Sequence, residues 1–302
     1  MDTDIDSFVP QEFFKKEPAL LYHYTTKEGF RGILKTKHLW ATHILFQNDS
    51  QEFKLAFSVL QQVIEENKYF DKDWHRLTAD QFKGVRIFTA SFSENFNIVD
   101  QWFNYANSNP GYCIGFKTKK LIQFIDKESE TEVENKETSM QSIPRSPWPV
   151  FKYKFCKCLY DIDEQKLFFK KTIENILETE KIINTAQNKV YELLLNYAPL
   201  FKEKKYKKEE EWRFIITDVK DKEKMKERIG KDFFIPYFEL NFVNPDCIGD
   251  IYIGYCPDLD KERLLDSTYY ICYLYGKSFP SKSDEKIYFI DDVMGKINAH
   301  SN

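Results

Sequence analysis

The chain has 302 residues, of which 42% are hydrophobic and 17% are aromatic. With only 10 glycines and 11 prolines, the composition excludes a collagen-like or mainly disordered chain and predicts a large buried core. The 44 basic and 48 acidic residues give a net charge of −4, so no overall basic field exists for nucleic acid or an anionic membrane, although a local basic patch stays open. The length suits one elaborated domain or two small ones.

The N-terminus and the apolar runs both predict a soluble cytoplasmic protein without a membrane partner. Residues 1–6 are acidic and lack the apolar stretch of a signal peptide. No apolar run reaches the roughly 18 residues that a membrane span needs. The six cysteines are scattered, and the spacing of Cys156 and Cys158 is too tight for a standard zinc site. We therefore expect reduced thiols and no metal.

The first half of the chain predicts strands separated by short helices. Thr25 or Thr26 can cap a helix whose apolar face carries Phe30, Ile33 and Leu34 at helical spacing. The predicted elements are an N-terminal arm at 1–18, strands at 19–26, 85–93 and 112–116, an extended stretch at 38–42, a turn at 48–50, and helices at about 51–67 and 99–106.

The second half predicts a helical block followed by more strands. Residues 126–148 are polar and are expected to form a surface loop or a partly disordered excursion. The other predicted elements are two Lys-rich helices within 163–203, a helix at 258–276, and strands at 151–160, 211–216, 233–242, 248–254 and 287–290. Because strands and helices do not alternate strictly, we predict an α+β fold, with the arm at 1–18 and a single domain at 19–302 that carries a helical insertion at about 163–205.

Three predicted strands carry a row of polar side chains, because alternate residues of a strand share a face. The rows are His23 with Thr25, then Thr89 with Ser91 and Ser93, and finally Glu209 with Glu211 and Arg213 if that strand begins early enough. Taken alone, each row has a more ordinary interpretation. A single histidine at the end of a strand is usually structural, a row of Ser and Thr is usually a solvated sheet face, and a Glu-rich stretch after lysines is usually a charged turn. An active site is indicated only if the three rows belong together.

The order of these motifs resembles a large bacterial family catalogued as a domain of unknown function. The resemblance spans about residues 20–292 and is carried by Leu21-Tyr22-His23-Tyr24-Thr25, Ala90-Ser91-Phe92-Ser93-Glu94, Gln101-Trp102, Glu209-x-Glu211-Trp212-Arg213 and Ile248-x-x-Ile251-x-Ile253-Gly254. That family is similar to the ADP-ribosyltransferase-like fold, with the DarT toxins and the RNA 2′-phosphotransferases as the nearest-looking relatives. The resemblance implies a split, bent β core with flanking helices that holds NAD.

The resemblance also implies an enzyme that cleaves the nicotinamide–ribose bond of NAD and transfers ADP-ribose to a nucleic acid or a protein, in a toxin or phage-defence role. Glu211 would accept a hydrogen bond from the ribose 2′-OH, and Glu209 would orient or deprotonate the acceptor. His23, beside Thr25, would bind the other ribose hydroxyls, and Ser91 and Ser93 would support Glu211.

Several assignments stay open within this resemblance. Tyr24, Trp102 and Tyr105 are the candidates for the ring that stacks on nicotinamide. Arg213 would bind a phosphate, lock Glu209 or form a structural ion pair. Two other functions remain: a catalytically silent ligand-sensing or interaction module that uses the Lys-rich helices, and an RNA end-processing phosphotransferase. The latter is disfavoured because the first strand offers only His23 as a basic group.

Overall fold

The computed structural model describes residues 4–47, 52–70, 86–107, 110–130, 151–220, 222–242, 245–276 and 286–291. These residues form a mixed α+β structure with ten strands, and every strand pair of known register is antiparallel except β9 with β10. The α+β class is confirmed, and the ADP-ribosyltransferase type of fold stays a prediction. The chain divides into two compact units, which are unit 1 (1–16, 41–90 and 150–238) and unit 2 (17–40, 91–149 and 239–302).

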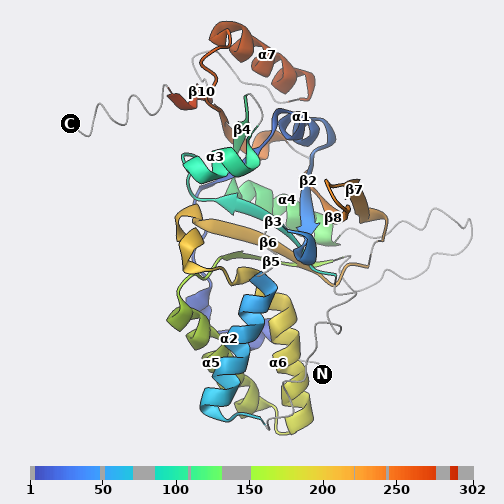
Figure 1. Ribbon diagram of the computed structural model, residues 1–302. Helices are drawn as coiled ribbons and strands as arrows, with labels where there is room; N and C mark the ends of the chain where they lie inside the picture. The colour runs from blue at the N-terminus through green and yellow to red at the C-terminus, as the bar shows by residue number, and fades with distance from the viewer. Residues whose placement is uncertain are drawn as a thin grey trace, which may run out of the picture. The chain divides into compact units, whose positions relative to one another are not determined.

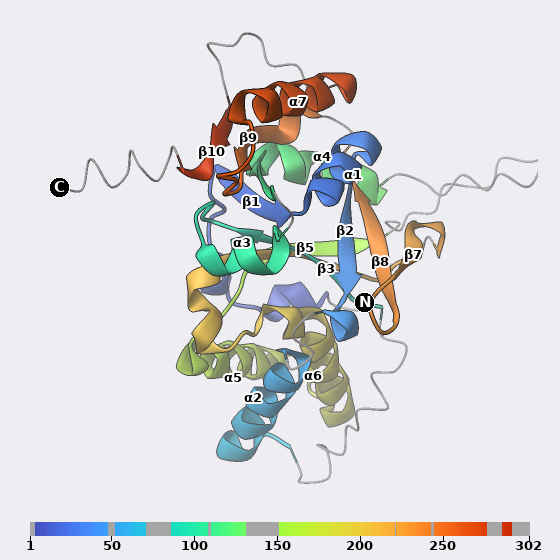
Figure 2. The same cartoon turned by 45° about the horizontal axis from the view of Figure 1, so that its top comes forward.

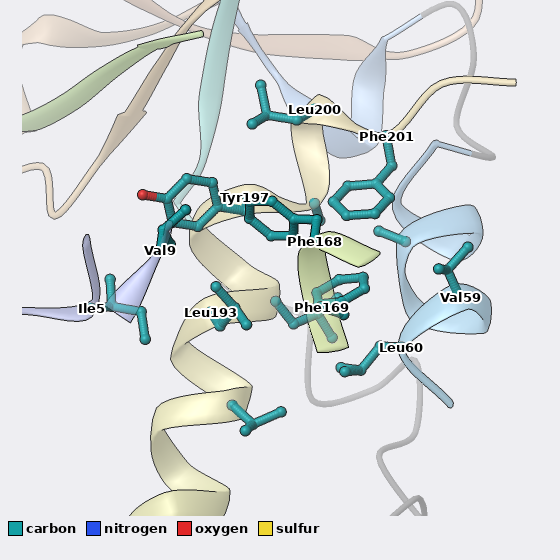
Figure 3. Close-up of a cluster of buried hydrophobic side chains, with 14 of the residues drawn as sticks. Ile5, Val9, Val59, Leu60, Phe168, Phe169, Leu193, Tyr197, Leu200 and Phe201 are labelled. Atoms are coloured by element: carbon teal, nitrogen blue, oxygen red, sulfur yellow. The ribbon is translucent and has the colours of Figure 1, made fainter. Parts of the chain in front are cut away.

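Three helices form the apolar core of unit 1 (Figure 1, Figure 2). They are α2 (Glu52–Asn67), α5 (Ile162–Thr179) and α6 (Ile183–Tyr197). The two predicted helices within 163–203 are therefore confirmed. Their apolar faces meet around Phe168, Phe169 and Phe201, with the Phe169 and Phe201 rings stacked at 4.7 Å (Figure 3).

The N-terminal segment is packed into the same core. The short 3-10 helices η1 (Ile5–Phe8) and η2 (Gln11–Phe13) bury Ile5, Phe8 and Phe13 in it. Tyr197 at the end of α6 donates a 2.7 Å hydrogen bond to the Asp6 carboxylate. The segment predicted as an arm thus contributes apolar side chains to unit 1.

The two faces of strand β6 have different surroundings, with the helical core on one side and aromatic rings on the other. The hydrogen-bonded pair β5 (Lys152–Lys157) and β6 (Glu211–Thr217) runs antiparallel. Ile215 belongs to the helical core, whereas Phe214 stacks on Phe155 at 4.2 Å on the opposite face. Since alternate residues share a face, Glu211 and Arg213 lie on the side of the helices.

The remaining elements of unit 1 are strands at one edge and short 3-10 helices. Strand β2 (His38–His43) pairs with β3 (Phe88–Ser93) through Thr42 and His43, and β7 (Met225–Ile229) forms a hairpin with β8 (Phe234–Asn241). Strands β2, β3 and β8 each have residues in both units. The 3-10 helices are η3 (Ile44–Phe46), η6 (Ala198–Leu200), η7 (Lys204–Glu209) and η8 (Lys222–Lys224).

Unit 2 is built on the strand order β10–β9–β4–β1, with β3 pairing β1 at Tyr22 and Ser93. The strands are β1 (Leu20–Thr25), β4 (Tyr112–Lys117), β9 (Ile248–Ile253) and β10 (Ile287–Phe289). Its helices are α1 (Lys27–Thr36), α3 (Val99–Tyr105), α4 (Thr118–Glu130), η9 (Pro245–Cys247) and α7 (Lys261–Leu274).

The start of α1 confirms the predicted cap and explains one glycine. The Thr26 side chain accepts a 3.1 Å hydrogen bond from the amide of Gly29. A Cβ at Gly29 would lie 2.0 Å from Thr25 Oγ1, so the first turn of α1 can approach the end of β1 only with glycine there.

Two predictions differ from the structure or fall outside it. Helix α4 continues to Glu130, into the stretch predicted as a polar loop from residue 126. The rest of that loop, from 131 to 148, and the turn at 48–50 lie outside the described residues.

Candidate active site

The carboxylate of Glu211 is held by two buried cations. Glu211 is the first residue of β6 and is 5% exposed. Arg213, two residues later on the same strand face, donates from Nε to Oε1 at 2.6 Å and from Nη2 to Oε2 at 3.0 Å. Lys202 Nζ donates to Oε2 at 2.5 Å. The predicted alignment of Glu211 with Arg213 is therefore confirmed, and the two side chains form a bidentate ion pair.

Lys202 comes from the segment between α6 and β6, where the backbone fixes its position. Its amide donates to the Leu159 carbonyl at 3.0 Å, and its own carbonyl accepts from Gln165 Nε2 at 2.9 Å. Gln165 is buried on α5 and also donates to the Leu159 carbonyl, at 2.7 Å. This lysine is an additional member of the site that the polar rows of the sequence did not reveal.

Glu209 reaches the same lysine without belonging to the strand. It is the last residue of η7, and Glu210 follows with a left-handed φ of 44° before β6 begins at Glu211. The strand therefore does not start early enough to align Glu209 with Glu211. The left-handed turn nevertheless returns the Glu209 carboxylate to Lys202 Nζ, which contacts both acids.

The two carboxyl groups of this cluster have opposite pKa shifts. Burial alone would raise the pKa of Glu211, but the charges and hydrogen bonds of Arg213 and Lys202 outweigh it and hold that pKa well below its usual range. Burial, aided by the charge of Glu211, raises the pKa of Glu209, and Lys202 offsets this only in part. Glu211 is thus kept ionised, whereas Glu209 takes up a proton more readily.

The remaining groups around Glu211 fix its backbone and its second cation. The amide of Glu211 donates to the Tyr160 hydroxyl at 2.8 Å. Arg213 Nη1 donates to the Pro199 carbonyl at 2.6 Å, which ties η6 to β6. The bidentate ion pair of Arg213 is with Glu211, and its charge also offsets in part the burial that raises the pKa of Glu209.

His23 lies on β1 in unit 2 and is held in one neutral tautomer. Its Nδ1 is 3.0 Å from the Ser91 carbonyl, which can only accept, so Nδ1 carries the proton and Nε2 is the acceptor. Burial lowers the pKa of His23, and the hydrogen bond to Ser91 counteracts this only in part. A neutral imidazole with Nε2 as acceptor can bind a hydroxyl group.

The side chains of three other predicted site residues in unit 2 bind neighbouring backbone groups. The Tyr24 hydroxyl donates to the Asn95 carbonyl at 2.7 Å and accepts from the Ile98 amide at 3.0 Å. Trp102 packs edge-on against Tyr24 and donates to the Phe96 carbonyl. Ser93 Oγ accepts from the Asn95 amide at 3.0 Å.

Thr25 and Tyr105 complete the set of predicted residues. Thr25 is buried against Gly29, and Tyr105 is 40% exposed on α3. The structure thus brings together Glu209, Glu211 and Arg213 in unit 1, and His23 with Ser91 in unit 2. A role of Ser91 and Ser93 in supporting Glu211 stays a prediction, as does the ring that stacks on nicotinamide.

Two chemical properties of the described residues bear on cofactors and membranes. Within the described ranges, no group of three or more His, Cys, Asp or Glu side chains is arranged to hold a metal ion. No helix in the part of the chain that the structure describes is both long and apolar enough to cross a bilayer.

Comparison with known proteins gives one partial match. Residues 101–214 match the model of a family described as "Protein of unknown function (DUF2971)". The matched stretch includes Lys202, Glu209, Glu211 and Arg213 and leaves out His23. No curated protein and no solved structure matches the chain significantly. The similarity therefore supports the predicted relation to a family of unknown function and carries no activity with it.

Proposed function

We propose that the chain is an ADP-ribosyltransferase-like enzyme that cleaves the nicotinamide–ribose bond of NAD and transfers ADP-ribose to a macromolecule. The observation that carries this proposal is the state of Glu211. Arg213 and Lys202 keep it ionised and supply three hydrogen bonds, one to Oε1 and two to Oε2. A carboxylate has about four acceptor sites, so a lone pair on Oε1 remains for a ribose 2′-OH.

The proposed chemistry uses that lone pair in the transition state. As the bond between the ribose carbon and nicotinamide breaks, nicotinamide leaves with the bonding electrons and positive charge develops on the sugar. A hydrogen bond from the 2′-OH to ionised Glu211 strengthens as this charge grows, so it stabilises the transition state more than bound NAD.

Glu209 and His23 take the two remaining roles in the proposal. Because the pKa of Glu209 is raised, its carboxylate is the better proton acceptor of the pair, and it takes the proton of the acceptor nucleophile as the new sugar bond forms. Neutral His23, in unit 2, offers Nε2 as an acceptor for a hydroxyl group of NAD.

A specific observation favours a second function, the catalytically silent ligand-sensing or interaction module. Glu211 and Arg213 lie on the face of β6 that also carries Ile215 into the helical core. Arg213 further binds the Pro199 carbonyl. In this alternative the charged side chains of the cluster only hold the segment between α6 and β6 in place, and NAD is bound without being consumed. The cluster consists of Lys202, Glu209, Glu211 and Arg213.

Nicotinamide release distinguishes the two functions. The purified chain is incubated with NAD and, separately, with protein, DNA and RNA acceptors, and free nicotinamide is quantified. We expect Glu211→Gln to lower the release by about 10²-fold or more, the scale of losing a key electrostatic group. Glu210→Gln, at the half-exposed neighbouring carboxylate, is the matched control and should retain activity.

A second variant guards against a folding defect in Glu211→Gln. His23→Gln lies in unit 2 and leaves the contacts of Glu211 in unit 1 unchanged. We expect it to lower nicotinamide release while the thermal stability of unit 1 is retained. If the natural sequence releases no more nicotinamide than Glu211→Gln with every acceptor, the enzymatic proposal is wrong. Thermal stabilisation by NAD without turnover would then support the silent module.

A further inference from the structure

The 3-10 helix η7 separates its side chains into an inner and an outer side. In such a helix, residues three positions apart lie one above the other. Tyr206 and Glu209 form the inner column, where Tyr206 is half-buried and Glu209 is buried. The outer columns are Lys204 with Lys207 and Lys205 with Lys208. All four lysines are exposed, and this lysine face is defined by them.

The inner side fixes the lysine face to the buried charge cluster. The Tyr206 ring lies 5.0 Å from Lys202 Nζ, and Glu209 binds the same ammonium group. Lys202 is itself held by Gln165 of α5. The four outer lysines are therefore carried by an anchored element, one residue away from the left-handed turn that leads into Glu211.

We propose that the lysine face binds the sugar–phosphate backbone of a short single-stranded nucleic acid. This partner is also the acceptor class for the transfer reaction, and in that respect alone the inference rests on the proposed function. Six residues of 3-10 helix span about 12 Å, which suits a footprint of a few phosphates rather than a long duplex. The net charge of −4 fits a local contact of this kind.

The local acids weaken the lysine face only modestly. Lys204 lies 3.8 Å from Asp161, and Lys205 forms an ion pair with Glu203. All four of these side chains are between 43% and 77% exposed, and exposed ion pairs contribute little to stability. Phosphates can therefore replace the two carboxylates at small cost.

Fluorescence anisotropy with labelled 12-nucleotide oligo(U) RNA and oligo(dT) DNA tests this inference. With two to four phosphates neutralised, the slope of log affinity against log salt should be about −1.4 to −2.8. Between 50 and 200 mM salt, the affinity should then fall about 7- to 50-fold. Comparing the RNA and DNA affinities identifies the preferred strand.

Matched quadruple variants locate the surface. Replacing Lys204, Lys205, Lys207 and Lys208 with Gln should weaken binding at least about tenfold, since it removes all the proposed phosphate contacts. The control replaces the exposed lysines Lys16, Lys54, Lys170 and Lys231 with Gln and changes the net charge by the same amount. It should bind within about twofold of the natural sequence.

Three results would overturn the inference. They are an equal loss in the control variant, a salt slope near zero, and binding of a poly-glutamate peptide of equal length as tight as that of either oligonucleotide. The outcome is separable from that of the proposed function. Nicotinamide release without oligonucleotide binding refutes the lysine face alone, whereas binding without release refutes the enzyme and leaves the lysine face standing.

Discussion

Replacing Lys202 with Met should destabilise unit 1 by about 3–5 kcal/mol, the usual cost of removing one partner from a buried ion pair. Lys202 is 5% exposed and its ammonium contacts both Glu209 and Glu211. Without it, two buried carboxylates share a single cation, Arg213. Met retains most of the volume of the lysine stem, so lost packing adds little.

The pH dependence of this loss follows from the direction of the pKa shifts. Burial alone would lower the pKa of Lys202, but the neighbouring carboxylates outweigh it and raise that pKa. A lysine with a raised pKa in the folded state contributes its full stabilisation below its unfolded pKa of about 10.4 and loses it only as the pH rises through the folded value. The loss in Lys202→Met should therefore be complete at pH 7. It should shrink below about pH 4, as the folded-state carboxylates that Lys202 neutralises take up protons and lose their negative charge.

Urea unfolding combined with amide hydrogen exchange measures this loss, since exchange at the β5–β6 ladder reports on unit 1 separately from unit 2. Lys204→Met, at an exposed lysine of the same segment, is the control and should change stability far less. A loss below about 1 kcal/mol in Lys202→Met, or one equal at pH 7 and well below pH 4, would refute the argument that this ammonium compensates two buried carboxylates.

Three further predictions address the other groups. Gly29→Ala should destabilise unit 2 by about 1–3 kcal/mol because of the contact with Thr25, whereas Gly32→Ala, whose Cβ would meet nothing within 4 Å, should be neutral or stabilising in thermal melts. The pKa of His23, measured by NMR, should lie below 6.5 with the proton on Nδ1. The folded state should therefore lose stability as the pH falls below about 6.5. A measured pKa above 6.5 contradicts the neutral assignment. Burial alone would raise the pKa of Glu211, but Arg213 and Lys202 outweigh burial and lower that pKa. The contribution of Glu211 to stability should therefore be present above about pH 4.3 and lost at lower pH. Glu211→Gln should lack this acid-dependent loss in urea titrations, and an unchanged loss would contradict the assignment.

Local patterns predicted the elements that carry their own signal. The helical spacing of apolar residues located α5 and α6, and the Thr26 cap located the start of α1. No helix was predicted at Thr118–Glu130, and its polar last turn was predicted as the start of a surface loop at residue 126. Its two final described side chains, Glu128 and Ser129, are nevertheless buried, and Glu128 accepts from the Asn241 amide at 2.7 Å. A tertiary contact of this kind leaves no local signal in the sequence.

The same reasoning explains why half of the charge cluster was predictable. Glu211 and Arg213 are two residues apart on one strand, so the period of a strand brings them together. The position of Lys202 depends on an isolated β-bridge between Leu159 and Phe201, and this bridge forms only because the segment after α6 folds back. Glu209 depends on the left-handed conformation of Glu210, a residue type that rarely adopts it.

The burial of this cluster sets the condition under which Glu211 can act in catalysis. A carboxylate that only stabilises a fold gains nothing from an unused acceptor site, whereas a carboxylate that binds a ribose hydroxyl requires one. Glu211 has such a site on Oε1, yet it is 5% exposed. Access to Oε1 therefore requires a local movement, and a movement of the segment from η6 to η7 would have to break its contacts with Arg213 and Glu211. If binding of NAD accelerates amide exchange in this segment, the segment opens to expose the Glu211 carboxylate. If exchange slows or stays the same while nicotinamide is released, the reaction uses another carboxylate.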